Sequence, residues 1–146
     1  MHRQWHELGP FTVFDVETTG MSPSRHRIVQ IAAVRIDPDG SRTCYQSLVN
    51  PGCPIPAVVS RIHHITDDMV VEAPRFTDVG YQFLDLAQDS TLVAHNARFD
   101  LGFLQESLAR SGMPLWKGKT LDSLTLTRKV FPGLASYSLQ SLRHSF

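Results

Sequence analysis

The sequence predicts an α/β domain in which a mixed sheet carries helices on its faces. Three segments rich in β-branched and aromatic residues, 11–16, 28–36 and 44–49, follow one another across short turns, which predicts an antiparallel meander. After this meander, helical periodicity alternates with short apolar segments, as in α/β domains. The 146 residues are enough for one domain and too few for two ordinary ones, so we expect a single domain over residues 1–146.

The three segments of the meander have different signals. The first, Phe-Thr-Val-Phe-Asp-Val, is typical of a strand and ends at Thr18-Thr19-Gly20. The second, 28–36, is a nearly continuous apolar run, which predicts a strand buried on both faces inside the sheet. Asp37-Pro38-Asp39-Gly40 is a turn sequence that allows the chain to return as a third strand.

The second half of the chain reads as helices and short strands. Three prolines, at positions 51, 54 and 56, mark a loop, and Gly112 and Pro114 end the helix before them. The expected elements are helices over 57–63, 76–87, 97–111, 123–131 and 138–146, with short strands at 91–94 and 120–121.

Composition excludes several classes of protein. Fourteen basic and 14 acidic residues give a formal net charge of zero, so the chain is no polycation that binds duplex nucleic acid by bulk charge. A small site that contacts phosphate through metal ions is compatible with this balance. No apolar run is long enough for a membrane span, and residues 1–6 lack the apolar core of a signal peptide. Cys44 and Cys53 match no zinc pattern and indicate a reduced, cytoplasmic protein, with a disulfide between them as the alternative.

A pair of carboxylates at the end of the first strand is the first candidate for a functional site. Asp15 and Glu17 are two residues apart, so both side chains point to the same face of a strand. Two adjacent like charges are unfavourable unless a cation lies between them, and Mg²⁺ or Mn²⁺ prefers carboxylate oxygens. A solvated strand end is the simpler interpretation of this pair taken alone.

A second group of polar residues, His95-Asn96-Ala97-Arg98-Phe99-Asp100, joins the strand at 91–94 to the following helix. Asp100 falls in the first helical turn, where a carboxylate favourably faces the helix dipole, so simple capping is one interpretation. Ligands of α/β sheets gather at the carboxyl ends of strands. If the first and fourth strands are parallel neighbours, Asp15, Glu17 and Asp100 converge there.

Both groups resemble motifs of a known family. Phe14-Asp15-Val16-Glu17-Thr18-Thr19-Gly20 resembles the first motif of the DEDDh 3′–5′ exonucleases, and residues 95–100 resemble the second. This group includes RNase T and the epsilon subunit of bacterial DNA polymerase III. Residues 62–67 and 137–142 also fit, so the resemblance covers residues 11–142. It implies a ribonuclease-H-like three-layer fold, two Mg²⁺ or Mn²⁺ ions, and removal of nucleotides from the 3′ end of single-stranded DNA or RNA in proofreading or repair. It also implies a DNA polymerase subunit as a partner.

The resemblance also implies roles for individual residues. Asp15, Glu17 and Asp100 would be the catalytic metal ligands, and Thr18 and Thr19 would approach the terminal nucleotide while Gly20 allows a tight exit from the strand. The other implied substrate contacts are His63, Asn96 and Phe99.

Alternatives remain for these other contacts. His63 either lines the pocket for the last bases or lies in a surface loop, and His64 replaces the glycine usual in the family, which affects the shape of that loop. Phe99 either stacks on a base or packs in the core. We expect His95 and Asn96 to tie their loop together by hydrogen bonds, and Asp122 to serve as a helix N-cap.

The third motif of the family, a histidine followed by an aspartate on a final helix, is not found in this sequence. His144 has no acid after it, so we interpret it as a surface residue. We therefore expect a domain truncated at its C-terminus, or a natural loss, with low activity as an exonuclease. The alternative function is a non-catalytic module that binds nucleic-acid ends or a polymerase partner. The absent helix further predicts self-association through the apolar faces at 101–108 and 139–142.

Overall fold

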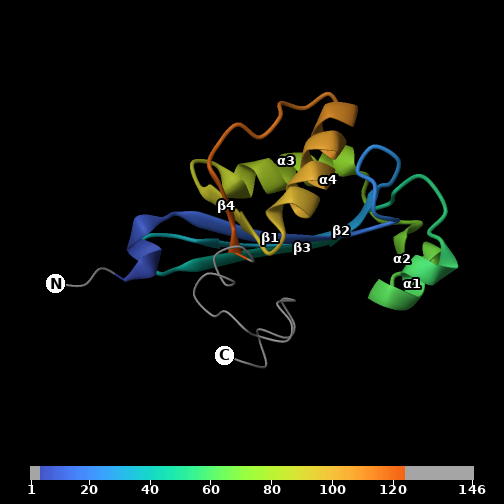
Figure 1. The fold of residues 1–146 in the computed structure, drawn as a ribbon, viewed down its shortest axis with the longest axis horizontal. Helices are drawn as coiled ribbons and strands as arrows, with labels where there is room; N and C mark the ends of the chain where they lie inside the picture. The colour runs from blue at the N-terminus through green and yellow to red at the C-terminus, as the bar shows by residue number, and fades with distance from the viewer. Residues whose placement is uncertain (1–3, 124–146) are drawn as a thin grey trace.

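The computed structural model describes residues 4–123, which form a five-stranded mixed sheet with helices (Figure 1). In chain order the elements are a 3-10 turn η1 (Trp5–Leu8), β1 (Phe11–Thr18), β2 (Ile28–Ile36), β3 (Arg42–Leu48), α1 (Ala57–His63), α2 (Asp67–Val70), α3 (Phe76–Ala87), β4 (Thr91–Ala94), α4 (Ala97–Arg110) and β5 (Thr120–Asp122). The predicted helices over 124–131 and 138–146 lie outside the described residues.

The strand order is β3-β2-β1-β4-β5, so β1 is the central strand. β1 pairs antiparallel with β2, and β2 pairs antiparallel with β3, which confirms the predicted meander. β4 and β5 add to the sheet in parallel with β1, as the alternation of helices and strands requires. The sequence predicts that Asp15, Glu17 and Asp100 converge if β1 and β4 are parallel neighbours. The structure meets this condition.

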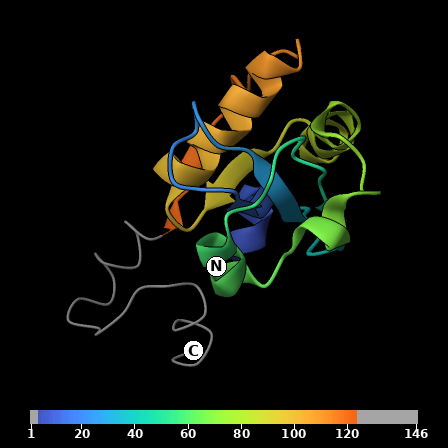
Figure 2. The same ribbon diagram turned by 90° about the vertical axis from the view of Figure 1, so that its right-hand side faces the viewer.

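Helices α3 and α4 cover one face of the sheet (Figures 1 and 2). The main core lies between them and the sheet, where the rings of Phe14 and Phe83 are 5.4 Å apart and Phe103 is fully buried. A smaller cluster on α1 and α2 includes Val29 of β2, together with Ile55, Ile65 and Val70. β2 is therefore buried on both faces near Val29, while Ala32 and Val34 further along are only half-buried. The expectation of burial on both faces holds for part of the strand.

The apolar face of α4 is buried in the core, whereas the sequence predicted that it would lack a packing partner. Leu104 and Leu108 are 0% exposed and belong to the main core, and Leu101 packs against that core. The prediction that residues 101–108 leave a free apolar face for self-association is wrong, because the sheet and α3 already cover it. The second face named in that prediction, 139–142, lies outside the described residues.

Two further features concern the chain's environment. Cys44 and Cys53 are both exposed and free. No helix within residues 4–123 combines the length and apolar character that crossing a membrane requires.

Candidate active site

The carboxyl end of β1 gathers the residues of the first motif. Alternation along the strand buries Phe14 and Val16 in the core and places Asp15 and Glu17 together on the other face, as predicted. β4 runs parallel to β1, so the segment that leaves β4 at His95 emerges at the same edge of the sheet. A recess of about 400 Å³ adjoins this point and is lined by Asp15, His95 and Ser123 together with side chains of β2 and β3.

Asp100 reaches from the first turn of α4 to β1. Its side chain is buried, and Oδ1 accepts a hydrogen bond from the backbone N–H of Val16 at 3.1 Å. A side-chain hydrogen bond also joins Asp100 to Asp15. The interpretation of Asp100 as a simple helix cap is therefore wrong. At the start of α4 the backbone N–H of Ala97 instead donates to Oδ2 of Asp122 at 3.3 Å, so Asp122 caps this helix.

The three carboxylates are electrostatically strained without a cation. Burial raises the pKa of Asp100 to about 7, and the charge of Asp15 contributes to this rise. Burial also raises the pKa of Asp15, although the hydrogen bond from Asp100 and the charge of His95 oppose it. The pKa of Glu17 is raised by burial and then by the charge of Asp15, while His63 lowers it. The raised pKa of Asp100 favours its protonated form, which relieves the repulsion from Asp15 when no cation is bound.

These residues fit a divalent cation in chemistry. No group of three or more His, Cys, Asp or Glu side chains within residues 4–123 is already arranged as a metal site. However, Asp15 and Asp100 are in direct contact, and the charge of Glu17 interacts with that of Asp15. A cation at this point would neutralise carboxylate oxygens, the ligands that Mg²⁺ and Mn²⁺ prefer.

The turn after β1 is held closed by hydrogen bonds. Thr18 Oγ1 donates to the carbonyl of Gly20 at 2.6 Å. The backbone N–H of Thr19 donates to the carbonyl of Arg27 at 2.8 Å, and the N–H of Arg27 donates to Thr19 Oγ1 at 3.0 Å. Both threonine hydroxyls thus hold the turn, and sequence reasoning missed Arg27 because it lies eight residues further along the chain.

Gly20 lies in the tight turn at a place where a side chain would not fit. It does not adopt the left-handed backbone conformation. Instead, a Cβ at this position would lie 2.5 Å from Cδ2 of His26, whose ring packs directly over the glycine. The nearby Nδ1 of His26 accepts a hydrogen bond from the N–H of Ser22 at 3.0 Å, which keeps that ring in place.

His63 connects α1 to the end of β1. Its Nδ1 accepts a hydrogen bond from the N–H of Ile65 at 3.1 Å, so Nε2 carries the proton and donates to the carbonyl of Thr18 at 3.0 Å. His63 is therefore at the site rather than in a detached surface loop. His64 adopts φ 63° and ψ 19° at the end of α1, the left-handed conformation that glycine favours. The loop keeps a glycine-like shape although histidine occupies it.

The second motif is arranged partly as expected. Nδ1 of His95 lies 3.2 Å from Oγ of Ser123, and the backbone carbonyl of Asn96 accepts hydrogen bonds from the N–H groups of Phe99 and Asp100. The loop is thus tied together through the His95 side chain and the Asn96 backbone. The ring of Phe99 packs against that of Phe103 at a centroid distance of 5.0 Å and stays half-buried, so it contributes to the core.

In a ribonuclease-H-like nuclease, carboxylates on the central strand meet a buried aspartate from the helix that follows the neighbouring parallel strand. This chain has the same arrangement, with Asp100 on α4. The chain belongs to the RNase T exonuclease family, whose model matches residues 12–146. It is 41% identical over 143 residues to DNA polymerase III subunit epsilon of Treponema pallidum, covering 97% of this chain and 66% of that protein. It is also 44% identical to a DNA polymerase III subunit epsilon-like protein of Rhodobacter capsulatus, covering 92% of this chain and 19% of that protein.

Solved structures agree with this assignment. Exonuclease X in complex with 5′ overhanging duplex DNA superposes with a TM-score of 0.71 at 31% identity, covering 92% of this chain and 72% of that one. Exonuclease I of E. coli in complex with an oligonucleotide has a TM-score of 0.81 at 19% identity, covering 92% of this chain and 35% of that one, which shows a shared fold. The chain thus spans 66% or less of the two relatives named above.

Proposed function

We propose that this chain is the metal-dependent domain of a 3′–5′ exonuclease that removes nucleotides from the 3′ end of single-stranded nucleic acid. The observation that carries the proposal is the convergence of Asp15 with the buried Asp100 at the end of the central strand, where Asp100 also accepts a hydrogen bond from the N–H of Val16. A fold gains no stability from two like charges brought together. Such a pair is instead explained by a cation that binds there during function.

In this proposal Asp15, Glu17 and Asp100 are the metal ligands, with Mg²⁺ or Mn²⁺ as the ions. Bound ions of this kind activate water and stabilise the charge on a leaving oxygen. Asp100 is oriented by the N–H of Val16, so its second oxygen remains for a cation. Glu17 is half-buried on the same strand face as Asp15 and supplies the third carboxylate.

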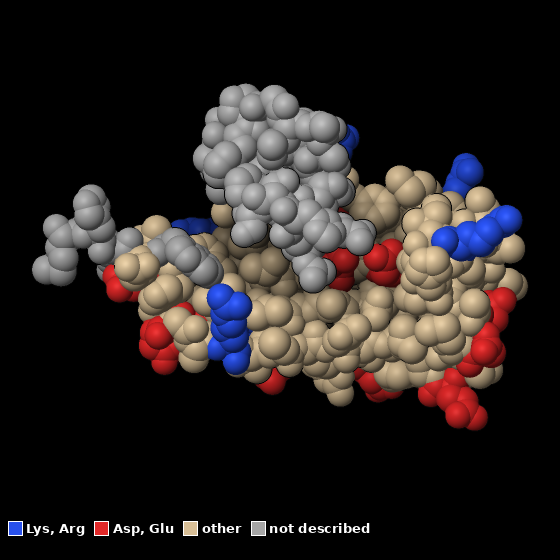
Figure 3. Space-filling view, turned by 90° about the horizontal axis from the view of Figure 1, so that it is seen from below, with Lys and Arg blue, Asp and Glu red and all other residues tan. Residues whose placement is uncertain are grey.

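We assign the 3′ end of the substrate to the turn beside these carboxylates. Thr18 and Thr19 are buried and hold that turn, and Gly20 lets it pack on His26. His63, Asn96 and Phe99 are proposed as contacts to the last nucleotides. On the part of the face in Figure 3 that described residues form, the Lys and Arg side chains are separated from one another. The formal net charge of zero favours recognition of a strand end over a long basic groove. The names of the relatives support DNA as the substrate and a polymerase as a partner. The two free cysteines support the cytoplasm as the proposed location.

A second candidate function is a module that binds strand ends without cleaving them. His63 and His95, the histidines that lower the pKa values of Glu17 and Asp15, are both engaged in hydrogen bonds. Neither is therefore assigned as the general base that takes a proton from water. A general base contributes roughly 10²–10⁴ in rate, so the chain studied alone should be a slow enzyme.

Degradation of a 5′-labelled single-stranded oligonucleotide in Mn²⁺ tests the proposal. We expect slow shortening from the 3′ end, its loss in EDTA and in Asp15→Asn, and retention in Asp85→Asn, which changes an exposed carboxylate on α3. An oligonucleotide ending in a 3′-phosphate should be a poorer substrate than one ending in a 3′-hydroxyl. Binding without any shortening would instead establish the second candidate, and cleavage that survives Asp15→Asn would place the site elsewhere.

A further inference from the structure

A separate recess of about 140 Å³ is lined by three arginines, Arg27, Arg75 and Arg110. We call it the arginine recess. Its remaining lining residues include Asn50, hydroxyl side chains and apolar groups, and none of them is Asp or Glu. The recess therefore concentrates positive charge in a chain whose formal net charge is zero.

The three arginines come from distant segments that the fold brings together. Arg27 directly precedes β2, Arg75 is the N-cap residue of α3, and Arg110 is the last residue of α4. Burial lowers the pKa of Arg110, and the charge of Arg27 lowers it further, so the guanidinium groups repel one another. Glu106 offsets this only partly, because its Oε2 lies 3.9 Å from Nη2 of Arg110 at an exposed position.

Two of these arginine side chains are positioned by contacts with the backbone. Nη2 of Arg110 donates to the carbonyls of Pro23 and Ser24 at 3.2 and 3.4 Å, which ties the end of α4 to the loop before β2, seen beside it in Figure 1. Arg75 lies over Gly52, where a Cβ would come within 2.6 Å of its Nη1. Gly52 also has φ +74°, so a residue with a side chain is doubly disfavoured there.

The size and the donors of the arginine recess match a phosphate group. At ~30 Å³ per water molecule its volume holds roughly four to five waters, comparable to the five heavy atoms of a phosphate. The guanidinium fork suits phosphate oxygens geometrically. The start of α3 adds backbone N–H groups that Arg75 does not cap with its side chain.

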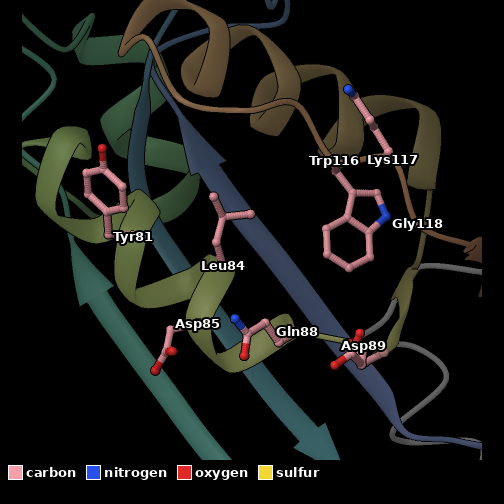
Figure 4. Close-up of a pocket in the computed structure, with 9 residues that line it drawn as sticks. Tyr81, Leu84, Asp85, Gln88, Asp89, Trp116, Lys117 and Gly118 are labelled. Carbon is pink, nitrogen blue, oxygen red and sulfur yellow. The ribbon is translucent and has the colours of Figure 1, made fainter.

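The larger recess of about 530 Å³ between α3 and the segment after α4 has a different character (Figure 4). It contains Asp85, Asp89 and Lys117 beside Trp116, so both signs of charge line it. Phosphate would meet two carboxylates there, and the arginine recess is the better match for an anion.

The arginine recess is connected to the proposed active site through the turn after β1. Arg27 is hydrogen-bonded to Thr19, which is two residues from Glu17. The chain advances by two residues from Glu17 to Thr19, and the step from Thr19 to Arg27 is one spacing between paired strands. Together these two steps span roughly 10–15 Å. A single strand is more extended than the ~3.4 Å per nucleotide of a duplex strand, so this distance corresponds to no more than roughly three to four nucleotides.

We propose that the arginine recess binds a backbone phosphate of the nucleic-acid strand whose 3′ end lies at Asp15, Glu17 and Asp100. The proposal rests on the proposed exonuclease function and extends it: the protein holds its substrate at the end and again several nucleotides away. A strand long enough to reach the recess is then held more tightly than a shorter one, although both present the same 3′ end.

Binding measured against salt concentration tests this proposal. Two single-stranded oligonucleotides with 3′ phosphorothioate linkages, of about two and about twelve nucleotides, are compared for the wild type, Arg75→Gln and Arg110→Gln. For the long strand we expect each variant to lower the slope of log affinity against log salt by about 0.7, the value for one lost phosphate contact. The ratio of wild-type to variant affinity should therefore rise about fivefold as the salt concentration falls from ~1 M to ~0.1 M. The short strand should bind all three proteins equally.

Arg42→Gln is the matched control, because Arg42 is exposed at the start of β3 and does not line the recess. An unchanged slope in both recess variants would overturn the proposal. A second result would also overturn it. If inorganic phosphate raises the melting temperature of the wild type but not of Arg75→Gln, and the long-strand slope is the same for both, the recess binds free phosphate and not the strand. Hydrolysis of an unmodified short strand by the wild type reports on the exonuclease function separately, because that strand does not reach the recess.

Discussion

Replacing Asp100 with asparagine removes one charge from the Asp15–Asp100 pair while keeping its shape. The amide oxygen of asparagine can accept the hydrogen bond from the N–H of Val16, as Oδ1 of Asp100 does at 3.1 Å. Its NH₂ group can donate to Asp15, as a protonated Asp100 does. Asp100→Asn thus reproduces the protonated form of the site at every pH and cannot contribute a carboxylate to a metal ion.

The size of the effect follows from the pKa of Asp100. Burial, and then the charge of Asp15, raise this pKa from 3.8 to about 7. Between these values the folded protein without metal holds a proton that the unfolded chain has released, so stability is highest at low pH and falls as pH rises. The difference of about 3 pH units corresponds to at most on the order of 4 kcal/mol of unfolding free energy. For a domain of this size that is roughly 8–16 °C in melting temperature.

Urea denaturation in EDTA, repeated from about pH 4 to about pH 8, measures this effect. We expect the wild type to lose free energy of unfolding over this range, Asp100→Asn to lose much less, and the control Asp85→Asn to follow the wild type. Adding Mn²⁺ at ~100 times its Kd near pH 8 should return about 2.7 kcal/mol to the wild type and little to Asp100→Asn. If the free energies of unfolding of the wild type and Asp100→Asn depend on pH in the same way, the raised pKa of Asp100 is refuted as the cause of the pH dependence. A full response of the variant to Mn²⁺ would refute the metal assignment.

Three other substitutions test the same region. Glu17→Gln should keep its stability in EDTA near pH 8, because burial and the charge of Asp15 disfavour the ionised glutamate, but should lose the Mn²⁺-induced rise in melting temperature. Gly20→Ala places a methyl group 2.5 Å from the ring of His26 and should lower the unfolding free energy in urea by about 1–3 kcal/mol. His64→Gly relieves a left-handed residue at φ 63° and should raise the same free energy by about 1 kcal/mol, and a loss of stability would contradict that explanation.

The elements of the fold were largely predictable because their signals are local. The strands at 28–36 and 91–94 and the helices at 57–63 and 76–87 have the predicted bounds in the structure, and the other predicted elements among the described residues differ by at most two residues at an end. The short helix α2 and the turn η1 were not anticipated, since four residues each give too little periodicity to detect. The mistaken free face at 101–108 arose because an apolar stripe shows that a helix packs on something, but does not show on what.

The sequence by itself determined the order of strands and helices, the pairing of Asp15 with Glu17 on one strand face, and the family. Only the tertiary structure decided what these residues do to one another. Val16 and Asp100 are 84 positions apart, yet a hydrogen bond joins them. Asp122 caps a helix that precedes it, His26 explains Gly20, and Arg27, Arg75 and Arg110 surround one recess. The physical reason is that periodicity and turn chemistry act over a few residues, whereas burial, charge coupling and close packing depend on distances that only the folded chain defines.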